Sequence, residues 1–396
     1  MKYLILIGDG MGDFPLEELG GKTPLMVARK PYMDMMAKRG FCGKVVTVPQ
    51  GYPPGSDIAC MSLFGYDPRK YYTGRAPIEF YGMGHEMEKD DVAFRCNLVY
   101  LEGDEDNLVM GDYSGGHISK EEASTLMSSL NESIGDGRIL FFPGLGYRNI
   151  MIWKNGEWRM ESTPPHDIQG KRISGFLPKG EGSSFLIRIM DRAREVLSQH
   201  EINKERLRRG LRPANSIWLW GQGKRADFVP FSEKFNLSGA TVCAVDLVKG
   251  ISRLAGLFTP YVEGATGYLD TNFGAKAKKA IELLSLFDVV YVHVEAPDEA
   301  SHEGKIEEKI RSIERIDSEI LGPIYEEKGD ELRFLIVTDH LTPISIRTHY
   351  AQPTPFVIYD KKMGYENENV TYNEFLSDRV YEPEHLLSIL FSKNRL

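Results

Sequence analysis

The chain contains little cysteine. Only four of its 396 residues are cysteines, they lie far apart, and no two form a CxxC pair: Cys42, Cys60, Cys96 and Cys243. This spacing argues against a disulfide framework or a zinc ribbon, and it is typical of a protein in a reducing compartment.

Long apolar runs and an excess of basic residues are also missing. No run approaches the ~18 apolar residues of a membrane span, and the short apolar start of the chain lacks a signal-peptide cleavage pattern. We therefore expect a cytoplasmic protein without a membrane partner. The net charge of −9 argues against a general nucleic-acid binder, which needs a basic footprint. An anionic substrate is compatible with this charge, because a bound metal can supply local positive charge.

Strands and helices alternate along most of the sequence. Apolar stretches such as "YLILI", "DVVYVHV" and "RFLIVTD" are typical of buried strands, and amphipathic stretches between them predict helices. The expected helices include 31–39, 184–199, 275–286 and 306–321, and a further core strand is expected at 216–220. This alternation predicts an α/β fold with a doubly wound, mostly parallel sheet.

The stretch 88–174 has a different pattern. Consecutive short strands with tight turns surround one helix at 119–134, which is typical of an antiparallel α+β unit. We expect this stretch to be a small domain inserted into an α/β core made of 1–87 and 175–396.

The turn "GDGMGD" after the first strand is compatible with three interpretations. A dinucleotide-binding loop needs G-x-G-x-x-G, but Asp13 occupies the third glycine position. That fold also needs an acidic residue at the end of the second strand, and "VVTVPQG" has none. The remaining interpretations are a tight turn whose glycines serve only the backbone, and a metal site with Asp9 as a ligand.

Other acidic and imidazole side chains support the metal interpretation. Asp298 and His302 have the i, i+4 spacing that places two side chains on one helix face. The candidate ligands all lie just beyond a strand or in the following loop: Asp9, Asp298, His302, Asp339, His340 and His349. Mixed carboxylate and imidazole sets suit manganese or zinc, and six ligands are enough for two ions. His293 is instead expected to pack within the sheet.

Ser56 is a candidate nucleophile. It follows Pro-Pro-Gly and precedes an apolar, helix-like run in "YPPGSDIACMSLFGY". A serine at a helix N-terminus beside a metal loses its proton easily, and the backbone N–H groups there bind phosphate. The alternative is an ordinary helix-capping serine.

Six segments occur in an order that matches a known family: "ILIGDGMGD", "PPGSDIACMSLFGYDP", "YTGRAPIE", "STPPHDIQGK", "APDEASHEG" and "TDH…RTH". They resemble the archaeal-type, cofactor-independent phosphoglycerate mutases of the alkaline phosphatase superfamily, over nearly the whole chain. The resemblance implies interconversion of 3- and 2-phosphoglycerate, a small phosphorylated substrate of glycolysis and gluconeogenesis, through a phosphoserine. It implies two divalent ions, manganese first, with magnesium, zinc or cobalt as alternatives, and no 2,3-bisphosphoglycerate.

The same resemblance assigns roles residue by residue. Ser56 becomes the nucleophile, and the inserted domain closes over the substrate. One ion is expected at Asp9, Ser56, Asp339 and His340, and the other at Asp298, His302 and His349. His166 and Asp167 match the family's substrate-handling pair, one of which is a candidate acid or base. Candidate ligands of the substrate's carboxylate or phosphate are Arg75, Lys171 and Arg206.

One departure from the family concerns the segment "WLWGQGK". Trp220 stands where close archaeal mutases carry an arginine, with Lys224 nearby as a further candidate substrate ligand. The substrate pocket is therefore expected to differ. The alternatives are a related phosphotransferase of the homoserine kinase type and a metal-dependent phosphatase, although the sequence has no G-x-x-x-x-G-K-[ST] loop to support an ATP site.

Overall fold

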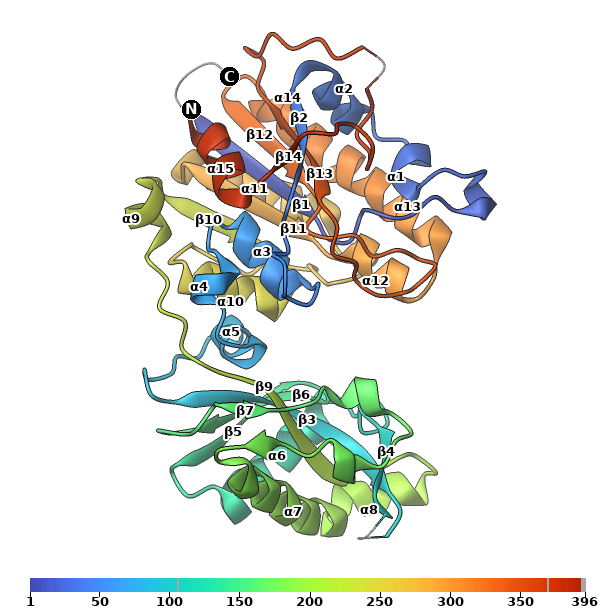
Figure 1. Ribbon diagram of the computed structural model, residues 1–396, viewed down its shortest axis with the longest axis vertical. Helices are drawn as coiled ribbons and strands as arrows, with labels where there is room; N and C mark the ends of the chain where they lie inside the picture. The colour runs from blue at the N-terminus through green and yellow to red at the C-terminus, as the bar shows by residue number, and fades with distance from the viewer. Residues whose placement is uncertain (105–106, 369, 393–396) are drawn as a thin grey trace. The chain divides into compact units, whose positions relative to one another are not determined.

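The computed structural model describes residues 1–104, 107–368 and 370–392 (Figure 1). The chain forms two compact units. The first consists of Met1–Tyr72 and Asp227–Leu396, and the second of Thr73–Ala226.

The first unit is built around a seven-stranded sheet. Its strands lie in the order β10, β11, β1, β12, β13, β2, β14. The bounds are β1 Lys2–Gly8, β2 Phe41–Val45, β10 Gly239–Val242, β11 Val289–Val294, β12 Leu332–Val337, β13 Thr354–Tyr359 and β14 Val380–Tyr381.

Most strand pairs of this sheet are parallel. Strands β10, β11, β1 and β12 run in the same direction, β14 is parallel to β2, and β13 is antiparallel to both of its neighbours. β11 and β12 are buried at every residue, and β1 at all but its first. Burial of this kind requires helices on both faces, so the predicted α/β class with a mostly parallel sheet is confirmed.

Helices cover both faces of the sheet (Figure 1). Leu4 and Leu6 of β1 share one apolar core with side chains of α2, α11, α13 and α14. Tyr3 points to the opposite face, as strand alternation requires, and contacts Phe391 of α15. The helices of this unit are α1 Pro24–Val27, α2 Pro31–Arg39, α3 Ser56–Leu63, α4 Pro68–Tyr71, α9 Phe231–Phe235, α10 Asp246–Leu254, α11 Phe273–Leu286, α12 Ala296–His302, α13 Ile306–Arg315, α14 Gly322–Lys328 and α15 Pro383–Phe391, with the 3-10 turn η1 Glu17–Leu19 and the π-helical η5 Ile316–Leu321.

The second unit contains a five-stranded antiparallel sheet. Its strands lie in the order β4, β3, β6, β5, and β9 also pairs with β3. The strands are β3 Val92–Glu102, β4 Val109–Asp112, β5 Ile139–Leu145, β6 Arg148–Trp153 and β9 Ser216–Lys224, besides the short pair β7 Met160–Glu161 and β8 Lys179–Gly180. The helical segments are α5 Arg75–Gly82, α6 Lys120–Ile134, η3 Pro165–Ile168, η4 Ile173–Gly175, α7 Ser183–Gln199 and α8 Glu201–Arg208.

This unit is larger than the insert expected at 88–174. The strand expected at 216–220 in the parallel core is part of β9, which pairs antiparallel with β3. The helix expected at 184–199 is α7, whose apolar side chains share a core with β9 and β3. The prediction that this strand and this helix belong to the parallel core is therefore wrong. An apolar or amphipathic pattern predicts an element but does not say which sheet the element joins.

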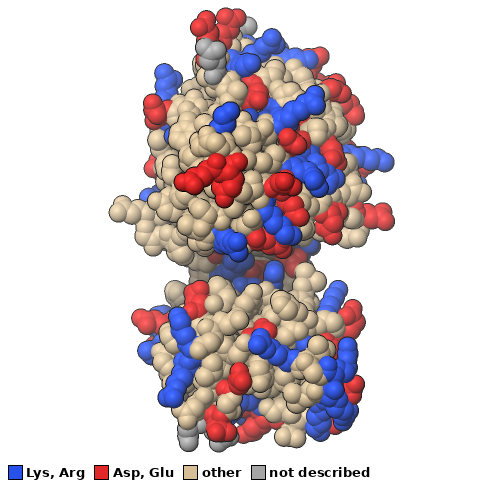
Figure 2. All heavy atoms as spheres, turned by 90° about the vertical axis from the view of Figure 1, so that its right-hand side faces the viewer, with Lys and Arg blue, Asp and Glu red and all other residues tan. Residues whose placement is uncertain are grey.

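Charges of both signs are interspersed over the face drawn in Figure 2. The helices in the described parts of the chain include none long and apolar enough to cross a bilayer.

Candidate active site

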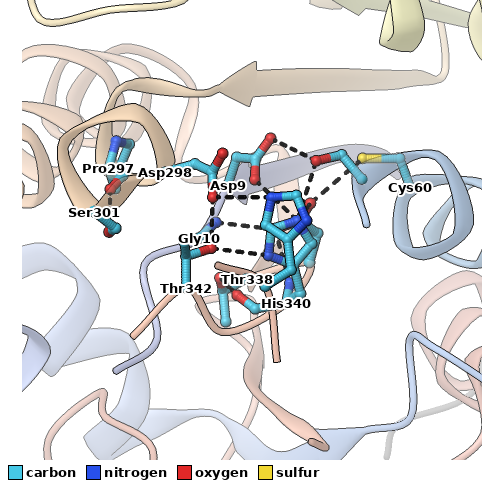
Figure 3. Close-up of polar contacts among 12 residues, drawn as sticks. Asp9, Gly10, Cys60, Pro297, Asp298, Ser301, Thr338, His340 and Thr342 are labelled. Atoms are coloured by element: carbon cyan, nitrogen blue, oxygen red, sulfur yellow. Dashed lines mark hydrogen bonds and ion pairs between the residues drawn. The ribbon is translucent and has the colours of Figure 1, made fainter. Parts of the chain in front are cut away.

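Three acidic segments follow neighbouring parallel strands of the first unit. Asp9 comes directly after β1, Asp298 lies in α12 beyond β11, and Asp339 and His340 follow β12. Because β11, β1 and β12 are adjacent and parallel, their carboxyl ends meet at one edge of the sheet, where ligands of open α/β sheets gather. Figure 3 shows Asp9, Asp298 and His340 close together at this edge.

Asp9 is fully buried in this cluster. Its Oδ2 lies 3.3 Å from Ser56 Oγ and 3.1 Å from His293 Nε2. Its Oδ1 is buried without a hydrogen-bond partner among the described residues. Burial, and then the neighbouring carboxylates Asp339 and Asp298, raise the pKa of Asp9 well above its usual range. A buried carboxylate oxygen without a hydrogen-bond partner, with two further carboxylates nearby, fits a site that binds a cation.

Asp339 and His340 are fixed by the opening turn. Asp339 Oδ1 accepts hydrogen bonds from the backbone N–H groups of Gly10 (3.0 Å) and His340 (2.8 Å). Gly10 adopts φ 61°, and a Cβ there would lie 2.6 Å from Asp298 Oδ1. The glycine therefore serves both the left-handed backbone and the close approach of a carboxylate.

Asp298 forms the second half of the cluster with two histidines. Its Oδ2 lies 3.1 Å from His302 Nε2, its Oδ1 lies 3.6 Å from His349 Nε2, and the two Nε2 atoms are 3.0 Å apart. Burial alone would raise the pKa of Asp298, but hydrogen bonds from both histidines hold it well below its usual range. Thr342 links the halves, because its Oγ1 contacts Asp298 and lies 3.1 Å from His340 Nδ1.

These side chains fit divalent ions. Oxygen and imidazole donors converge on a small volume, and the two facing Nε2 atoms require something positive between them or a proton on one of them. His340 adjoins both halves of the cluster, so the donors divide less sharply than the two sets expected from the sequence. Within the described residues, three triads have ligand atoms within 4.8 Å of one another: Asp9–Asp339–His340, Asp298–His340–His349 and Cys60–His293–Asp339.

Ser56 is the first residue of α3. Its Oγ lies 3.1 Å from His340 Nε2 and 3.3 Å from Asp9 Oδ2, so the hydroxyl belongs to the cluster. The capping alternative is not supported, because Gly55 is the N-cap residue and no side chain caps the helix.

Two buried residues of the site have no clear sequence signal. His293 lies within β11, and its contact with Asp9 depends on the pairing of β11 with β1. Cys60 lies one turn after Ser56 on α3, with Sγ 3.9 Å from Asp339 Oδ2. Burial raises the pKa of the Cys60 thiol well above its usual range, so the group remains a neutral donor. The i, i+4 spacing from Ser56 is the only pattern that could have pointed to Cys60.

The second unit holds the other candidate residues. His166 and Asp167 occupy η3, with His166 Nε2 3.6 Å from Asp167 Oδ1 and both side chains at least half exposed. Lys171 donates to the Asp167 carbonyl (2.9 Å). Arg75 begins α5 and pairs with Glu79 (2.7 Å). These four residues therefore remain candidates on this unit.

Arg206 has a structural role instead of the expected substrate-binding role. Its side chain is 4% exposed, and its guanidinium binds the Glu122 carboxylate and the carbonyls of Gly115, Gly116 and Arg212. Every nitrogen of the guanidinium is thus engaged within the unit.

Lys224 ends β9 and pairs with Asp90 (3.3 Å). Trp220, on the same strand, donates its Nε1–H to Asn97 Oδ1 (3.0 Å).

Comparison with known proteins gives one family. The sequence model described as 2,3-bisphosphoglycerate-independent phosphoglycerate mutase matches residues 37–203. A relative from Geobacter sulfurreducens, named a probable enzyme of this type, is 51% identical over 94% of both chains. A relative from Methanothermobacter thermautotrophicus, named 2,3-bisphosphoglycerate-independent phosphoglycerate mutase 2, is 48% identical, and the match covers 98% of this chain and 97% of the relative.

Solved structures agree with this result. A protein from Pyrococcus horikoshii superposes with a TM-score of 0.84 at 30% identity, covering 99% of this chain and 98% of that one. The cofactor-independent phosphoglycerate mutase of Thermoplasma acidophilum superposes with a TM-score of 0.67 at 27% identity, covering 98% and 99%. Together with the carboxylate–imidazole cluster around a serine, these matches show that the chain belongs to the 2,3-bisphosphoglycerate-independent phosphoglycerate mutases.

Proposed function

We propose that this chain interconverts 3-phosphoglycerate and 2-phosphoglycerate through a phosphoserine at Ser56. The observation that carries this proposal is the position of Ser56 Oγ, between Asp9 and His340 at the N-terminus of a buried helix, in a member of this family. A phosphoryl group on Oγ would lie beside the backbone N–H groups at the N-terminus of α3, where the helix favours an anion.

Each half-reaction exchanges one phosphorus–oxygen bond for another. Ser56 Oγ enters the cycle without its proton and bonds to phosphorus while the bond to one glycerate oxygen breaks, and that oxygen takes a proton from the His166–Asp167 pair. The second half-reaction transfers the phosphoryl group from Oγ to the other hydroxyl of the same glycerate, which loses its proton. We assign His166 and Asp167 to hold the proton that passes between the two hydroxyls. The inserted unit is proposed to exclude water, so that transfer prevails over hydrolysis.

Divalent ions are part of this proposal. Asp9, Ser56, Asp339 and His340 would hold one, and Asp298, His302 and His349 the other, with manganese as the first choice for mixed oxygen and nitrogen donors. When bound, such ions stabilise negative charge on the attacking and leaving oxygens. Asp9 contacts Ser56, and Asp298 contacts His302 and His349, so the two aspartates keep these donors in position. Thr342 holds both Asp298 and His340 in place.

Ser56→Ala tests the nucleophile. We expect loss of 2-phosphoglycerate formation from 3-phosphoglycerate in a coupled assay, because the group proposed to carry the phosphoryl intermediate is gone. Acid-quenched wild-type protein should show phosphate on the peptide that contains residue 56.

Ser62→Ala is the matched control. Ser62 lies on the same helix, and its hydroxyl donates to the Ile58 carbonyl away from the cluster, so this variant should keep its activity. Full mutase activity in Ser56→Ala would contradict the mechanism. Steady release of inorganic phosphate by the wild type would indicate a phosphatase, and phosphohomoserine formed from homoserine and ATP would indicate a kinase.

A further inference from the structure

A fully buried lysine of the first unit joins the two loops that follow β1 and β12 and carry candidate metal ligands. Lys309 lies on α13, and its ammonium group donates three hydrogen bonds. The acceptors are the carbonyls of Gly12 (3.0 Å) and Thr342 (3.0 Å) and the carboxylate oxygen Oδ2 of Asp13 (2.8 Å). Because an ammonium group has three N–H donors, the hydrogen-bonding capacity of Lys309 is fully used in holding these loops.

The backbone of Thr342 is fixed on both sides. Its N–H donates to the Gly12 carbonyl (3.1 Å), and its carbonyl accepts from Lys309 (3.0 Å). The Thr342 hydroxyl contacts Asp298 and lies 3.1 Å from His340 Nδ1 (Figure 3). Because a β-branched side chain has few rotamers, a fixed backbone also fixes the position of this hydroxyl between the two halves of the cluster.

Two acidic side chains accompany the buried ammonium group. Asp13 is itself fully buried, and its Oδ1 accepts the backbone N–H of Ile344 from the loop after β12 (3.2 Å). Glu374 accepts the Asp13 backbone N–H (2.8 Å). Burial lowers the pKa of Lys309, whereas the charges of Asp13 and Glu374 oppose this shift. A buried ion pair often stabilises a fold no better than apolar residues of similar volume, so the directed hydrogen bonds of Lys309 indicate a role in positioning.

We infer that Lys309 is a positioning residue of the metal centre and acts on it through Thr342. By fixing the Thr342 backbone, it keeps the threonine hydroxyl between Asp298 and His340, which belong to different sets of candidate ligands. This inference rests on the proposed function, which places divalent ions at these ligands. All three hydrogen bonds of Lys309 go to groups other than the candidate ligands, so its effect on metal binding passes through the loops that it holds.

The direct test is Lys309→Met, which keeps the length of the side chain and removes the ammonium group. We expect the manganese affinity of the metal-free protein, measured by isothermal titration, to fall by about 10- to 100-fold, as is usual when a partner outside the ligand set is lost. The sign is informative, because removal of a nearby positive charge would by Coulomb's law alone tighten the binding of a cation. Lys30→Met is the matched control, since Lys30 is a buried lysine of the same unit that pairs with Asp34 (2.9 Å), and it should leave manganese affinity unchanged.

A double-mutant cycle with Thr342→Val tests the route of the effect. Valine keeps the shape of threonine and lacks the hydroxyl, so this variant alone should weaken manganese binding. If Lys309 acts through that hydroxyl, adding Lys309→Met to Thr342→Val should weaken binding by less than about threefold more. A merely structural role would not produce this coupling, because independent losses multiply.

Each remaining outcome would overturn the inference. Unchanged or tighter manganese binding by Lys309→Met would show an ion pair that serves stability alone, and a full further loss in the Thr342→Val background would show that Lys309 does not act through Thr342. If Lys309→Met does not fold, Lys309→Met with Asp13→Asn leaves no unpaired charge at the pair and should show the same loss of affinity. Wild-type protein that binds no manganese would overturn the proposed metal sites as well, whereas normal binding by wild type and Lys309→Met alike would overturn this inference alone.

Discussion

The two oxygens of the Asp9 carboxylate have different surroundings. Oδ2 lies beside Ser56 Oγ and His293 Nε2, whereas Oδ1 has no hydrogen-bond partner in the described parts of the chain. A buried oxygen left in this way costs roughly 1–3 kcal/mol, which an ion at the site would offset. Burial lowers the pKa of His293 to about 4, so its neutral imidazole donates to Oδ2 at neutral pH. His293 therefore orients a carboxylate whose other oxygen is available to a metal.

Removal of the His293 donor should weaken metal binding. We expect His293→Leu to lower manganese affinity by about 10- to 100-fold, as is usual when an outer partner of a ligand is lost. His293→Gln, which retains an N–H donor, should recover most of that affinity. Isothermal titration of the metal-free protein with manganese measures both.

Equal manganese affinity in wild type and His293→Leu would show that Asp9 needs no orienting donor. Equal loss in the leucine and glutamine variants would show that the imidazole matters through its packing and not through its N–H.

Residues of the site differ in how well the sequence predicts them. Asp9, Asp298 and Asp339 are predictable because each follows a strand, and the carboxyl ends of parallel strands meet. His293 is not, because its contact with Asp9 comes from the pairing of β11 with β1, which no local spacing encodes.

At the scale of elements, the N-terminus of helix α2 is capped by a carboxylate from a distant part of the chain. Asp317, in η5, accepts the backbone N–H groups of Tyr32 (3.2 Å) and Met33 (2.8 Å), which have no partner within the helix. Burial raises the pKa of Asp317 to about 6, although these hydrogen bonds oppose the shift. The folded protein therefore holds the Asp317 proton more tightly than the unfolded chain does.

This shift has a defined effect on stability. Between about pH 4 and pH 6 the folded state binds more protons at Asp317, so the contribution of this group falls as pH rises. Asp317→Asn lacks that dependence. We expect its free energy of unfolding, relative to wild type, to rise by about 2.4 kcal/mol between pH 4 and pH 7, in urea titrations at each pH. Asp136→Asn, at an exposed carboxylate that pairs with Arg138, is the control. A constant difference between wild type and Asp317→Asn would show that the carboxyl is already ionised at pH 4 in the fold.

The order and kind of the elements follow from the sequence more fully than their partners do. Helices such as α6 and α7 match the expected ranges within a residue or two, because amphipathic periods and caps are local. The pairing of β9 with β3, and the antiparallel direction of β13 in a mostly parallel sheet, depend on contacts distant in sequence.

At the scale of the whole molecule, the candidate groups divide by unit. The proposed metal ligands and Ser56 all belong to the first unit, and His166 and Asp167 belong to the second. The sequence predicted a core with an insert, and the wider bounds of the second unit bring Arg75 and Trp220 into it. Metal binding and proton handling are thus assigned to separately packed units.

Removal of the metal should therefore lower the stability of the first unit and leave that of the second unchanged. A ligand that binds only the folded state stabilises it by RT ln(1 + [L]/Kd), about 2.7 kcal/mol at a hundredfold excess over Kd. We expect manganese at that excess to slow hydrogen exchange in β1, β11 and β12, whose ends carry the ligands, and a chelator to reverse the effect. Peptides from β3, β6 and β9 should exchange at the same rate in both conditions, because their core shares no side chain with the ligand set. Equal protection of both units by manganese would show that they unfold together, and no protection of β1 would remove Asp9 from the ligand set.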